Sequence, residues 1–334
     1  MGFITYNKLI KKVRIYFLIY FLILSGILLS SCKKSVNWDV ECYTVEEKIF
    51  KTDFSNCETV EFNDHQDKIQ RTDSLSSEWD LLQTHHCVGD FRISYEDGDR
   101  DQRYAEICAD PTDPDNDVIK FKIIEPHIRE GTHKKGRVQF NLNDNQCIKE
   151  FYQKVRLYIH PDMEYLKQWD EKVHWLSIAE FWNNANFAGE RNPFRVTVSL
   201  FKLDEGPVDE MYFAVVGDRD IRIGGWDPIW VEINEDFSVP FGTWMEIEMY
   251  LLEGDEDSGR FYMSVTPVGG EKTILFDVHN TTQHPREKHA DGYTHINPLK
   301  LYTSDKLIEF MSENDKNLEI YWDDWEFWRN KSID

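Results

Sequence analysis

The chain has 334 residues, with 38 lysines and arginines against 61 aspartates and glutamates, so its net charge is −23. This acidic balance excludes a general nucleic-acid-binding protein, which needs a basic surface, and we expect no nucleic-acid partner. Hydrophobic residues make up 41% of the chain and aromatic residues 14%, which excludes a disordered chain because such a composition can bury a core.

The N-terminal segment predicts export from the cytoplasm. Its charged residues are all basic: Lys8, Lys11, Lys12 and Arg14. They are followed by an apolar run over 15–29, which is too short for a helix that spans a bilayer core of about 30 Å. A basic flank, a short apolar segment and small residues before a cut site predict a signal peptide over 1–31. This segment carries four of the positive charges, so the net charge of the rest of the chain is −27.

The residues Leu29-Ser30-Ser31-Cys32 resemble the lipobox of bacterial lipoproteins. This resemblance implies that Cys32 is lipidated, with palmitate-type acyl chains, and becomes the mature N-terminus, followed by a tether over 32–44. Lys33, and not an aspartate, directly follows Cys32, and by resemblance to Gram-negative sorting rules this favours the outer membrane, on either of its faces. The alternative is an uncleaved signal anchor with an incidental cysteine.

The remaining cysteines are Cys42, Cys57, Cys87, Cys108 and Cys147. An exported protein can form disulfides, and an odd number leaves at least one thiol unpaired, while the pairing itself stays open. Their spacing fits no zinc site, so we interpret them as structural and not catalytic.

From residue 45 to 330 the sequence predicts one β domain, because apolar and polar residues alternate between turn segments. In the clearest segment, 150–160, Phe151, Val155, Leu157 and Ile159 share one face. The same alternation appears over 194–200, 244–250, 260–266 and 318–328. Ser304 is a predicted N-cap of a short helix near the C-terminus. We therefore expect an all-β, two-sheet antiparallel jelly-roll sandwich with one sheet curved around a groove.

Three stretches resemble the concanavalin A-like lectin and glucanase jelly rolls: Phe241-Gly242-Thr243-Trp244-Met245-Glu246, Gly259-Arg260-Phe261 and Tyr321-Trp322-Asp323-Asp324-Trp325-Glu326-Phe327-Trp328. The resemblance covers roughly 118–328. It implies a lipoprotein of a bacterial polysaccharide-utilisation system, with polysaccharide and other proteins of that system as partners.

Two further stretches resemble the jelly-roll polysaccharide lyases: Gly136-Arg137-Val138-Gln139-Phe140 and Ile178-Ala179-Glu180-Phe181-Trp182. The resemblance retains Arg137 from the first lyase motif. Glu180 and Trp182 stand where the second lyase motif has glutamine and histidine, and the Glu-x-Asp-x-x-Glu set of the glucanases is not present.

The polar face of 150–160 is the first candidate site, and it carries Tyr152, Lys154, Arg156, Tyr158 and His160. Such a face could bind an acidic sugar and neutralise its carboxylate while a tyrosine or histidine abstracts a proton. If Arg137 and Gln139 belong to the same concave sheet, both sets converge on one groove. The alternative is a solvated outer face, which is ordinary for an antiparallel sheet.

The segment 174–184 is the second candidate, with His174, Glu180 and Trp182. Trp182 could stack on a sugar ring, and Glu180 could act as a general acid if burial raised its pKa. The alternative is that Trp175 and Phe181 pack in the core and the rest of the segment lies on a loop.

The acidic turn with Asp113, Asp115 and Asp117 spaces oxygen ligands two residues apart, which makes it a weak candidate for a structural calcium ion. A solvated acidic turn is the alternative. No other cofactor is expected.

The sequence therefore leaves three hypotheses. The first is a lipid-anchored outer-membrane protein that binds polysaccharide and assists its degradation. The second is a polysaccharide lyase or glycoside hydrolase of the same fold, acting on a complex glycan that includes acidic sugars. The third is a structural or adhesive envelope protein.

Overall fold

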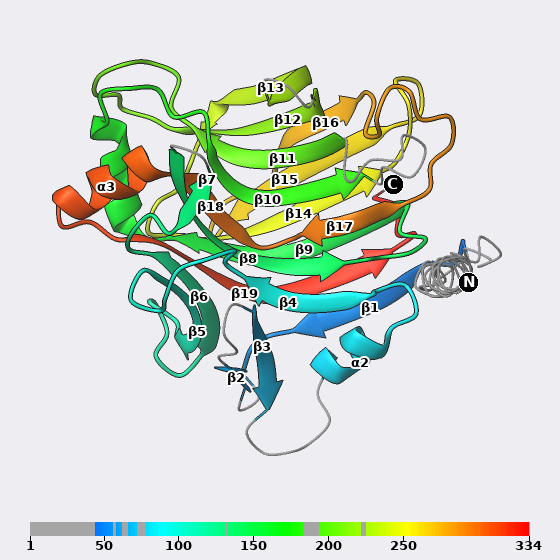
Figure 1. Ribbon diagram of the computed structural model, residues 1–334, viewed down its shortest axis with the longest axis horizontal. Coiled ribbons are helices and arrows are strands. Elements are labelled where there is room, and N and C mark those ends of the chain that lie inside the picture. The colour runs from blue at the N-terminus through cyan, green and yellow to red at the C-terminus, as the bar shows by residue number, and fades with distance from the viewer. Residues whose placement is uncertain are drawn as a thin grey trace, which may run out of the picture. The chain divides into compact units, whose positions relative to one another are not determined.

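A computed structural model describes residues 44–55, 58–61, 66–71, 78–130, 133–183, 194–221 and 225–333 (Figure 1). The unit that it describes begins at Thr44. The predicted signal peptide and the lipidation site Cys32 lie outside these ranges. Within the ranges, no helix combines the length and apolar character needed to cross a bilayer.

The strands form two antiparallel sheets. The smaller, eight-stranded sheet contains, in spatial order, β16 (Thr273–His279), β15 (Arg260–Pro267), β14 (Trp244–Leu252), β9 (Glu150–Ile159), β19 (Leu318–Arg329), β6 (Asp117–Ile123) and β5 (Arg103–Ala109), with β1 (Glu47–Thr52) paired to β19. Non-consecutive neighbours such as β14, β9 and β19 show that the chain crosses repeatedly between the sheets.

The larger sheet has eleven strands. Its order is β13 (Trp226–Ser238), β12 (Tyr212–Asp220), β11 (Phe194–Phe201), β10 (Leu176–Asn183), β17 (Tyr293–Asn297), β8 (His133–Asn143), β4 (Asp90–Ser94), β3 (Gln66–Arg71) and β2 (Glu58–Glu61), while β18 (Lys300–Ser304) pairs with β10 and β8, and β7 (Ile128–Glu130) pairs with β8.

The two sheets pack face to face, and the alternating apolar residues fill the space between them. The rings of Phe151 on β9 and Phe181 on β10 lie 5.1 Å apart, and those of Phe140 on β8 and Trp325 on β19 lie 5.3 Å apart. The four apolar residues predicted to share a face of β9 are fully buried. Large aromatic side chains therefore hold the layers together by burial of apolar area. The predicted two-sheet antiparallel jelly-roll sandwich is confirmed.

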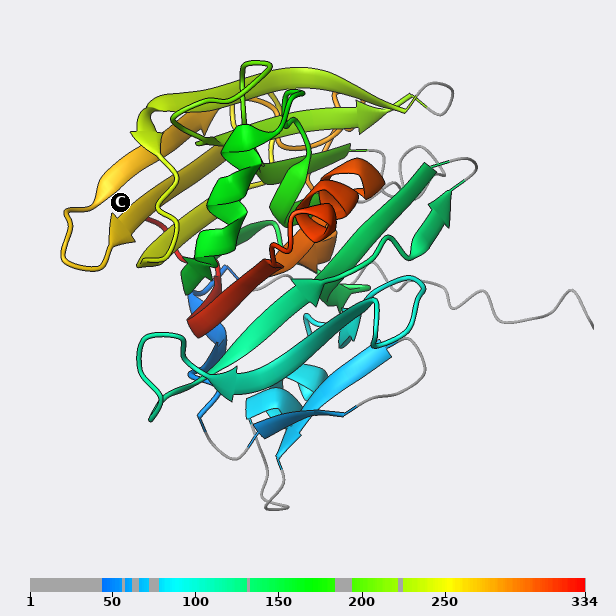
Figure 2. The same cartoon turned by 90° about the vertical axis from the view of Figure 1, so that its left-hand side faces the viewer.

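The predicted C-terminal helix is α3 (Asp305–Glu313), with Ser304 at its N-cap, although the Ser304 side chain makes no capping hydrogen bond. The structure adds two short elements that the alternation did not predict, α2 (Glu78–Thr84) and the 3-10 helix η1 (Pro161–Gln168). In η1, proline stands in the first turn, where its missing N–H is tolerated. Figure 2 shows η1 and α3 side by side, where the Phe310 ring stacks 5.4 Å from that of Tyr165.

The cysteines behave as structural residues. Cys147 is disulfide-bonded, whereas Cys87 and Cys108 are free thiols, which agrees with the prediction that at least one thiol is unpaired. Burial raises the pKa of the Cys108 thiol to about 11, and burial also raises that of Cys87. Both thiols are thus protonated at neutral pH, whereas a reactive cysteine is a thiolate at that pH.

Candidate functional site

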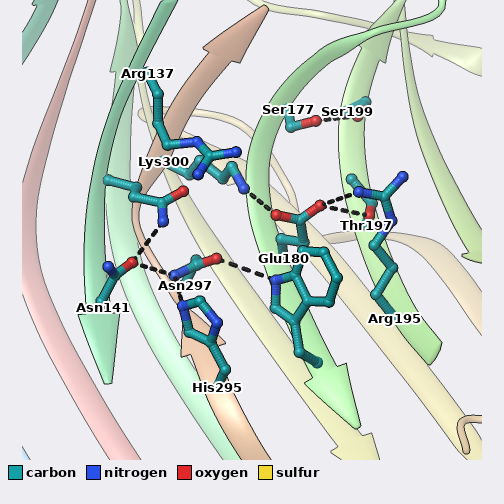
Figure 3. A network of polar contacts seen from close by, with 12 residues as sticks. Arg137, Asn141, Ser177, Glu180, Arg195, Thr197, Ser199, His295, Asn297 and Lys300 are labelled. Carbon is teal, nitrogen blue, oxygen red and sulfur yellow. Dashed lines mark hydrogen bonds and ion pairs between the residues drawn. The ribbon is translucent and has the colours of Figure 1, made fainter. Parts of the chain in front are cut away.

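Polar side chains gather on the outer face of the eleven-stranded sheet, where β8, β17, β18, β10 and β11 run next to one another (Figure 3). Their apolar neighbours in each strand point inward to the core, so the alternate positions face away from it. This outward set comprises Arg137, Gln139, Asn141, Ser177, Glu180, Trp182, Arg195, Thr197, Ser199, His295, Asn297, Lys300 and Tyr302.

Glu180 lies at the centre of this set and is only 1% exposed. One carboxylate oxygen, Oε2, accepts a hydrogen bond from Lys300 Nζ, and the other, Oε1, accepts one from Arg195 Nη1 at 2.8 Å. Burial acts to raise the pKa of Glu180, but the charges of Lys300 and Arg195 outweigh it and lower the pKa to about 2. Glu180 is therefore a carboxylate at neutral pH, and the prediction of a general acid with a raised pKa is wrong.

Arg195 connects Glu180 to a second carboxylate. Its Nε and Nη2 atoms donate to the two oxygens of Asp218 on β12, at 2.8 and 3.0 Å, in a bidentate pair. The guanidinium carbon also lies 3.9 Å from the ring centroid of Trp226 and 5.3 Å from that of Trp182. Such a planar cation between two carboxylates and two indole rings has little freedom to move.

Lys300, Tyr302 and Arg137 form the adjoining part of the face. The Tyr302 ring centroid lies 4.8 Å from Lys300 Nζ and 4.2 Å from the Arg137 guanidinium carbon. Arg137 also forms an ion pair with Glu96. Lys300 is fully buried, and burial lowers its pKa to about 7 despite the attraction of Glu180.

A ladder of amides continues the face toward β17. Gln139 Nε2 donates to Asn141 Oδ1 at 2.7 Å, and the side-chain amide of Asn297 donates to the same oxygen. The Asn297 oxygen accepts from Trp182 Nε1 at 3.4 Å, and the Trp182 ring stacks on His295 with centroids 6.0 Å apart. Trp182 is thus fixed on the outer face and does not pack in the core.

A groove of about 710 Å³ opens on this face beside the Glu180 cluster. Aromatic side chains line its walls: Trp175, Phe201, Trp226 and Tyr302. Hydroxyls, cations and acids lie among them: Ser177, Thr197, Ser199, Ser304, Lys134, Lys135, Arg195, His174, Asp218 and Asp305. An apolar wall with a few polar groups is the usual composition of a ligand site.

The structure separates the two sets of residues that the sequence analysis expected to converge. Arg137, Gln139, His174, Glu180 and Trp182 belong to the eleven-stranded side. Tyr152, Lys154, Arg156, Tyr158 and His160 lie on or next to β9, which belongs to the eight-stranded sheet. Although β8 and β9 follow each other in the chain, they lie in opposite layers, so their outer faces point to opposite sides. The expected convergence on one groove is therefore wrong.

On β9, the polar side chains are engaged with neighbours of their own sheet. Lys154 Nζ lies 2.6 Å from Glu246 Oε2, and Arg156 Nη1 lies 3.1 Å from Asp323 Oδ2. His160 Nδ1 accepts from the backbone N–H of Asp162 and so caps η1.

The tyrosines of β9 are equally unsuited to proton abstraction at neutral pH. Tyr152 packs against Tyr250 and Tyr262, and Tyr158 packs against Trp244. Burial, followed by the charge of Glu248 for Tyr152 and of Asp110 for Tyr158, raises the pKa of both phenols. This face fits the alternative interpretation, a structural outer surface.

The sequence analysis missed Arg195, Asp218, Trp226, Lys300 and Tyr302. Arg195 stands in a segment whose alternation was recognised, but the alternation carries no sign of which sheet the strand joins. Lys300 and Tyr302 belong to a five-residue strand, where the pattern is too short to stand out.

Within the described ranges, two groups bring three metal-ligating side chains within 4.8 Å of one another: His85, His86 and Cys87, and Glu253, Glu287 and Asp291. The expected calcium ligands Asp113, Asp115 and Asp117 are exposed and form no such group among those residues. Asp113 Oδ1 instead accepts a hydrogen bond from the backbone of Asp115 at 3.2 Å. Calcium binding by this turn stays a prediction.

Comparison with known proteins finds similarity in structure but not in sequence. No protein-family model matches the chain, and no curated protein sequence matches it. A PL-14 alginate lyase from Aplysia kurodai superposes with a TM-score of 0.48 at 9% identity, covering 84% of this chain and 98% of the lyase.

Two further lyase structures are similar to the chain. The alginate lyase Aly36B in complex with alginate tetrasaccharide has a TM-score of 0.45 at 10% identity, with 85% of this chain and 98% of the lyase covered. An endo-β-1,4-glucuronan lyase from the fungus Trichoderma reesei has a TM-score of 0.42 at 10% identity, with coverage of 72% and 94%. These similarities concern the arrangement of strands and assign no activity to this chain.

Proposed function

We propose that the protein binds a polysaccharide chain in the groove over the eleven-stranded sheet. The observation that carries the proposal is the composition of the groove, in which Trp175, Trp226 and Tyr302 stand beside the hydroxyls of Ser177, Thr197 and Ser199. An aromatic ring offers a flat apolar surface to the C–H face of a sugar, while hydroxyls and charged groups can bind its oxygens.

The charges near the groove favour a glycan that includes acidic sugars. Lys134 and Lys135 line one end, and Arg195 lines the floor, although Arg195 is already paired with Asp218 and Glu180. The acidic chain repels a polyanion at long range, but charges beyond a Debye length of about 8 Å are screened in physiological salt. Local lysines can therefore act on a sugar carboxylate at short range.

We also propose that the protein is located at the outer membrane. Lipidation of Cys32 would hold the groove domain at the outer membrane, where a captured glycan could be passed to other proteins of a polysaccharide-utilisation system. Support for this part comes from the lipobox-like sequence alone.

Substitution of Trp226 tests the groove. Trp226→Ala should weaken binding of the glycan that wild type prefers in a panel of neutral and uronate polysaccharides by about tenfold, equivalent to about 1.4 kcal/mol. The matched control is Trp328→Ala, since Trp328 is likewise half-buried but belongs to β19 in the opposite sheet. Calorimetric titration of both folded variants measures the difference.

Equal affinities for the two variants would contradict the groove as the binding site. A panel that shows no binding to wild type would contradict polysaccharide binding itself and would favour the structural or adhesive hypothesis.

A second candidate function is a polysaccharide lyase, favoured by the adjacency of Arg137, Lys300 and Tyr302. Cations that neutralise a uronate and a phenol or amine that transfers a proton are the groups a β-elimination needs. Lys300 is fully buried against Glu180, so Tyr302, which lines the groove, is the group placed to transfer the proton. A glycoside hydrolase is less favoured, because Glu180 is a buried anion and not a general acid.

Incubation with polyuronates separates the two functions. A lyase would generate the ultraviolet absorbance of a new C4–C5 double bond, and this signal should disappear in Tyr302→Phe. Binding without product formation would assign the protein to glycan capture.

A further inference from the structure

A cluster of carboxylates lies at the end of the sandwich, apart from the groove. It is formed by Glu253, which directly follows β14, and by Glu287 and Asp291, which belong to the loop from β16 to β17. Each can present an oxygen so that all three lie within 4.8 Å of one another. The loop passes from the eight-stranded sheet to the eleven-stranded sheet, so the cluster lies where the two layers are joined.

The carboxyl groups of Glu253 and Glu287 are buried and have few polar partners. Glu287 is 8% exposed, and apart from a contact with the neighbouring carboxyl group of Asp291 its carboxylate oxygens have no hydrogen-bond partner. Glu253 accepts hydrogen bonds from the amide of Asn183 and from the backbone N–H of Gly292, the latter at 2.7 Å. Burial and the charge of Asp291 are among the largest influences on both carboxyl groups, and neither group forms an ion pair with a lysine or arginine of the described ranges. Burial, with the charges of neighbouring carboxylates, raises the pKa of Glu253 to about 7 and that of Glu287 to about 9. Keeping these buried groups ionised is costly without a positive partner, which a bound cation would supply.

Two buried amides next to the carboxylates also have unpaired oxygens. Gln283 Nε2 donates to the backbone oxygen of Glu287 at 3.2 Å, while its Oε1 has no partner. Asn183, at the end of β10, donates to Glu253 and likewise leaves its Oδ1 without a partner. Both amides are more than nine-tenths buried. Unpaired buried polar atoms are uncommon in native proteins, and here they are all acceptors.

We propose that Glu253, Glu287 and Asp291 bind a calcium ion, and that the amides of Gln283 and Asn183, whose nitrogens contact Glu287 and Glu253 here, rotate to present their unpaired oxygens to it. Calcium takes six to eight oxygen ligands in flexible geometry, and carboxylate and amide oxygens are the kinds it prefers. Magnesium retains several waters, for which a buried cluster leaves little room. Zinc prefers nitrogen and sulfur ligands, which this group lacks.

The ion would fix the loop that leads directly into β17. Tyr293, the first residue of β17, follows Gly292, whose N–H binds Glu253. Two and four residues after Tyr293, β17 places His295 and Asn297 in the polar face described above (Figure 3). Calcium would thus order one edge of that face while touching no sugar, and its binding does not depend on whether the groove binds polysaccharide.

Terbium, a luminescent calcium substitute, tests the site on the full chain in detergent. Tyr293 lies in the electrostatic environment of both Glu253 and Glu287 and can sensitise a bound terbium ion. We expect sensitised emission that calcium displaces, and we expect Glu287→Gln to weaken calcium binding by about tenfold or more. The matched control is Asp115→Asn in the exposed acidic turn, which should bind calcium as wild type does.

Thermal unfolding gives a second readout. Calcium should raise the unfolding temperature of wild type and of Asp115→Asn, since a ligand that binds only the folded state stabilises it. In EDTA, Glu287→Gln should be at least as stable as wild type, because it removes one of three crowded carboxylates, and calcium should not stabilise it. Asp291→Asn provides a second variant if Glu287→Gln does not fold.

Three results would overturn the proposal. They are the absence of binding at millimolar calcium, calcium binding that survives both cluster variants, and calcium binding that is lost in Asp115→Asn. The first would mean that the carboxylates share protons, and the third would place the ion in the turn at Asp113.

Discussion

Glu180 is an anion because two cations on the same face of the sheet approach it from the strands on either side of its own strand. Lys300 comes from β18 and Arg195 from β11, the strands that flank β10. Removal of the carboxylate would leave the buried amine of Lys300 without its acceptor, while Arg195 would keep only its pair with Asp218. The loss of one partner from a buried ion pair typically costs about 3–5 kcal/mol.

We therefore predict that Glu180→Gln lowers the free energy of unfolding by about 3–5 kcal/mol at neutral pH. Urea denaturation of both proteins measures the difference. Thr197→Val, which removes only a weak 3.4 Å contact to the same carboxylate, is the control. A loss below about 1 kcal/mol would show that Glu180 is no more than a surface ion-pair partner.

The pH dependence of this difference has a defined sign. The pKa of Glu180 in the folded protein is about 2, below its ordinary value of 4.5. A lowered carboxyl pKa stabilises the folded state above the ordinary value and loses that effect as the pH falls through the folded value. The gap between wild type and Glu180→Gln should therefore narrow as the pH falls from 4.5 toward 2. A gap that stays constant or widens would contradict the ionised state.

The same residues show what a sequence can and cannot predict about the site. Arg156 and Arg195 both occupy polar positions of alternating strands, and alternation predicts correctly that each faces away from the core. It cannot show which sheet a strand joins, because that depends on pairings between distant segments. Arg195 therefore lies in the groove, and Arg156 lies on the opposite side of the molecule.

At the level of the elements, β19 departs from regular alternation and still buries its tryptophans. Trp322 and Trp325 are three residues apart, which in a regular strand puts them on opposite faces, yet both are fully buried. Asp324 has a φ of 47°, and the pairing of β19 with β9 shifts register between Asp323 and Glu326. A β-bulge thus returns both indoles to the core.

We predict that Asp324→Val destabilises the protein by about 1–3 kcal/mol, since a β-branched residue adopts positive φ only with strain, whereas Asp324→Gly is close to neutral. Glu326→Val on the same strand is the control and loses an ion pair to Lys51 and a weak 3.4 Å hydrogen bond from Trp328 Nε1. Chemical denaturation of the three variants measures the effect. Equal stability of Asp324→Val and Glu326→Val would show that the bulge does not require this conformation.

The strands that the sequence predicted are those with long, regular alternation, such as β9, β11, β14 and β15. The bulge in β19 and the five-residue β18 were not predicted, because register and short pairings are decided by the neighbouring strands and not by local pattern.

At the scale of the whole molecule, the acidic charge of the chain bears on how the protein could attach to a membrane. A chain with a net charge of −27 beyond residue 31 has no electrostatic attraction to an anionic membrane. Stable attachment to a bilayer would therefore depend on acyl chains at Cys32, each buried CH₂ contributing about 0.8 kcal/mol.

Cys32→Ala should prevent acylation and release the protein from the membrane fraction, and labelling with a fatty-acid probe followed by fractionation measures both effects. Cys42→Ala, which changes a cysteine outside the lipobox-like segment, should remain acylated and membrane-bound. A Cys32→Ala protein that stays in the membrane without a label would contradict the lipoprotein proposal.

A crystal structure of the protein with a bound oligosaccharide, cut from the polysaccharide that wild type prefers, tests the central claim most directly. The account predicts sugar rings in the groove of the eleven-stranded sheet, stacked on Trp226 and in contact with Thr197 and Ser199. Sugar bound instead on the eight-stranded sheet, over Tyr152 and Arg156, would contradict it.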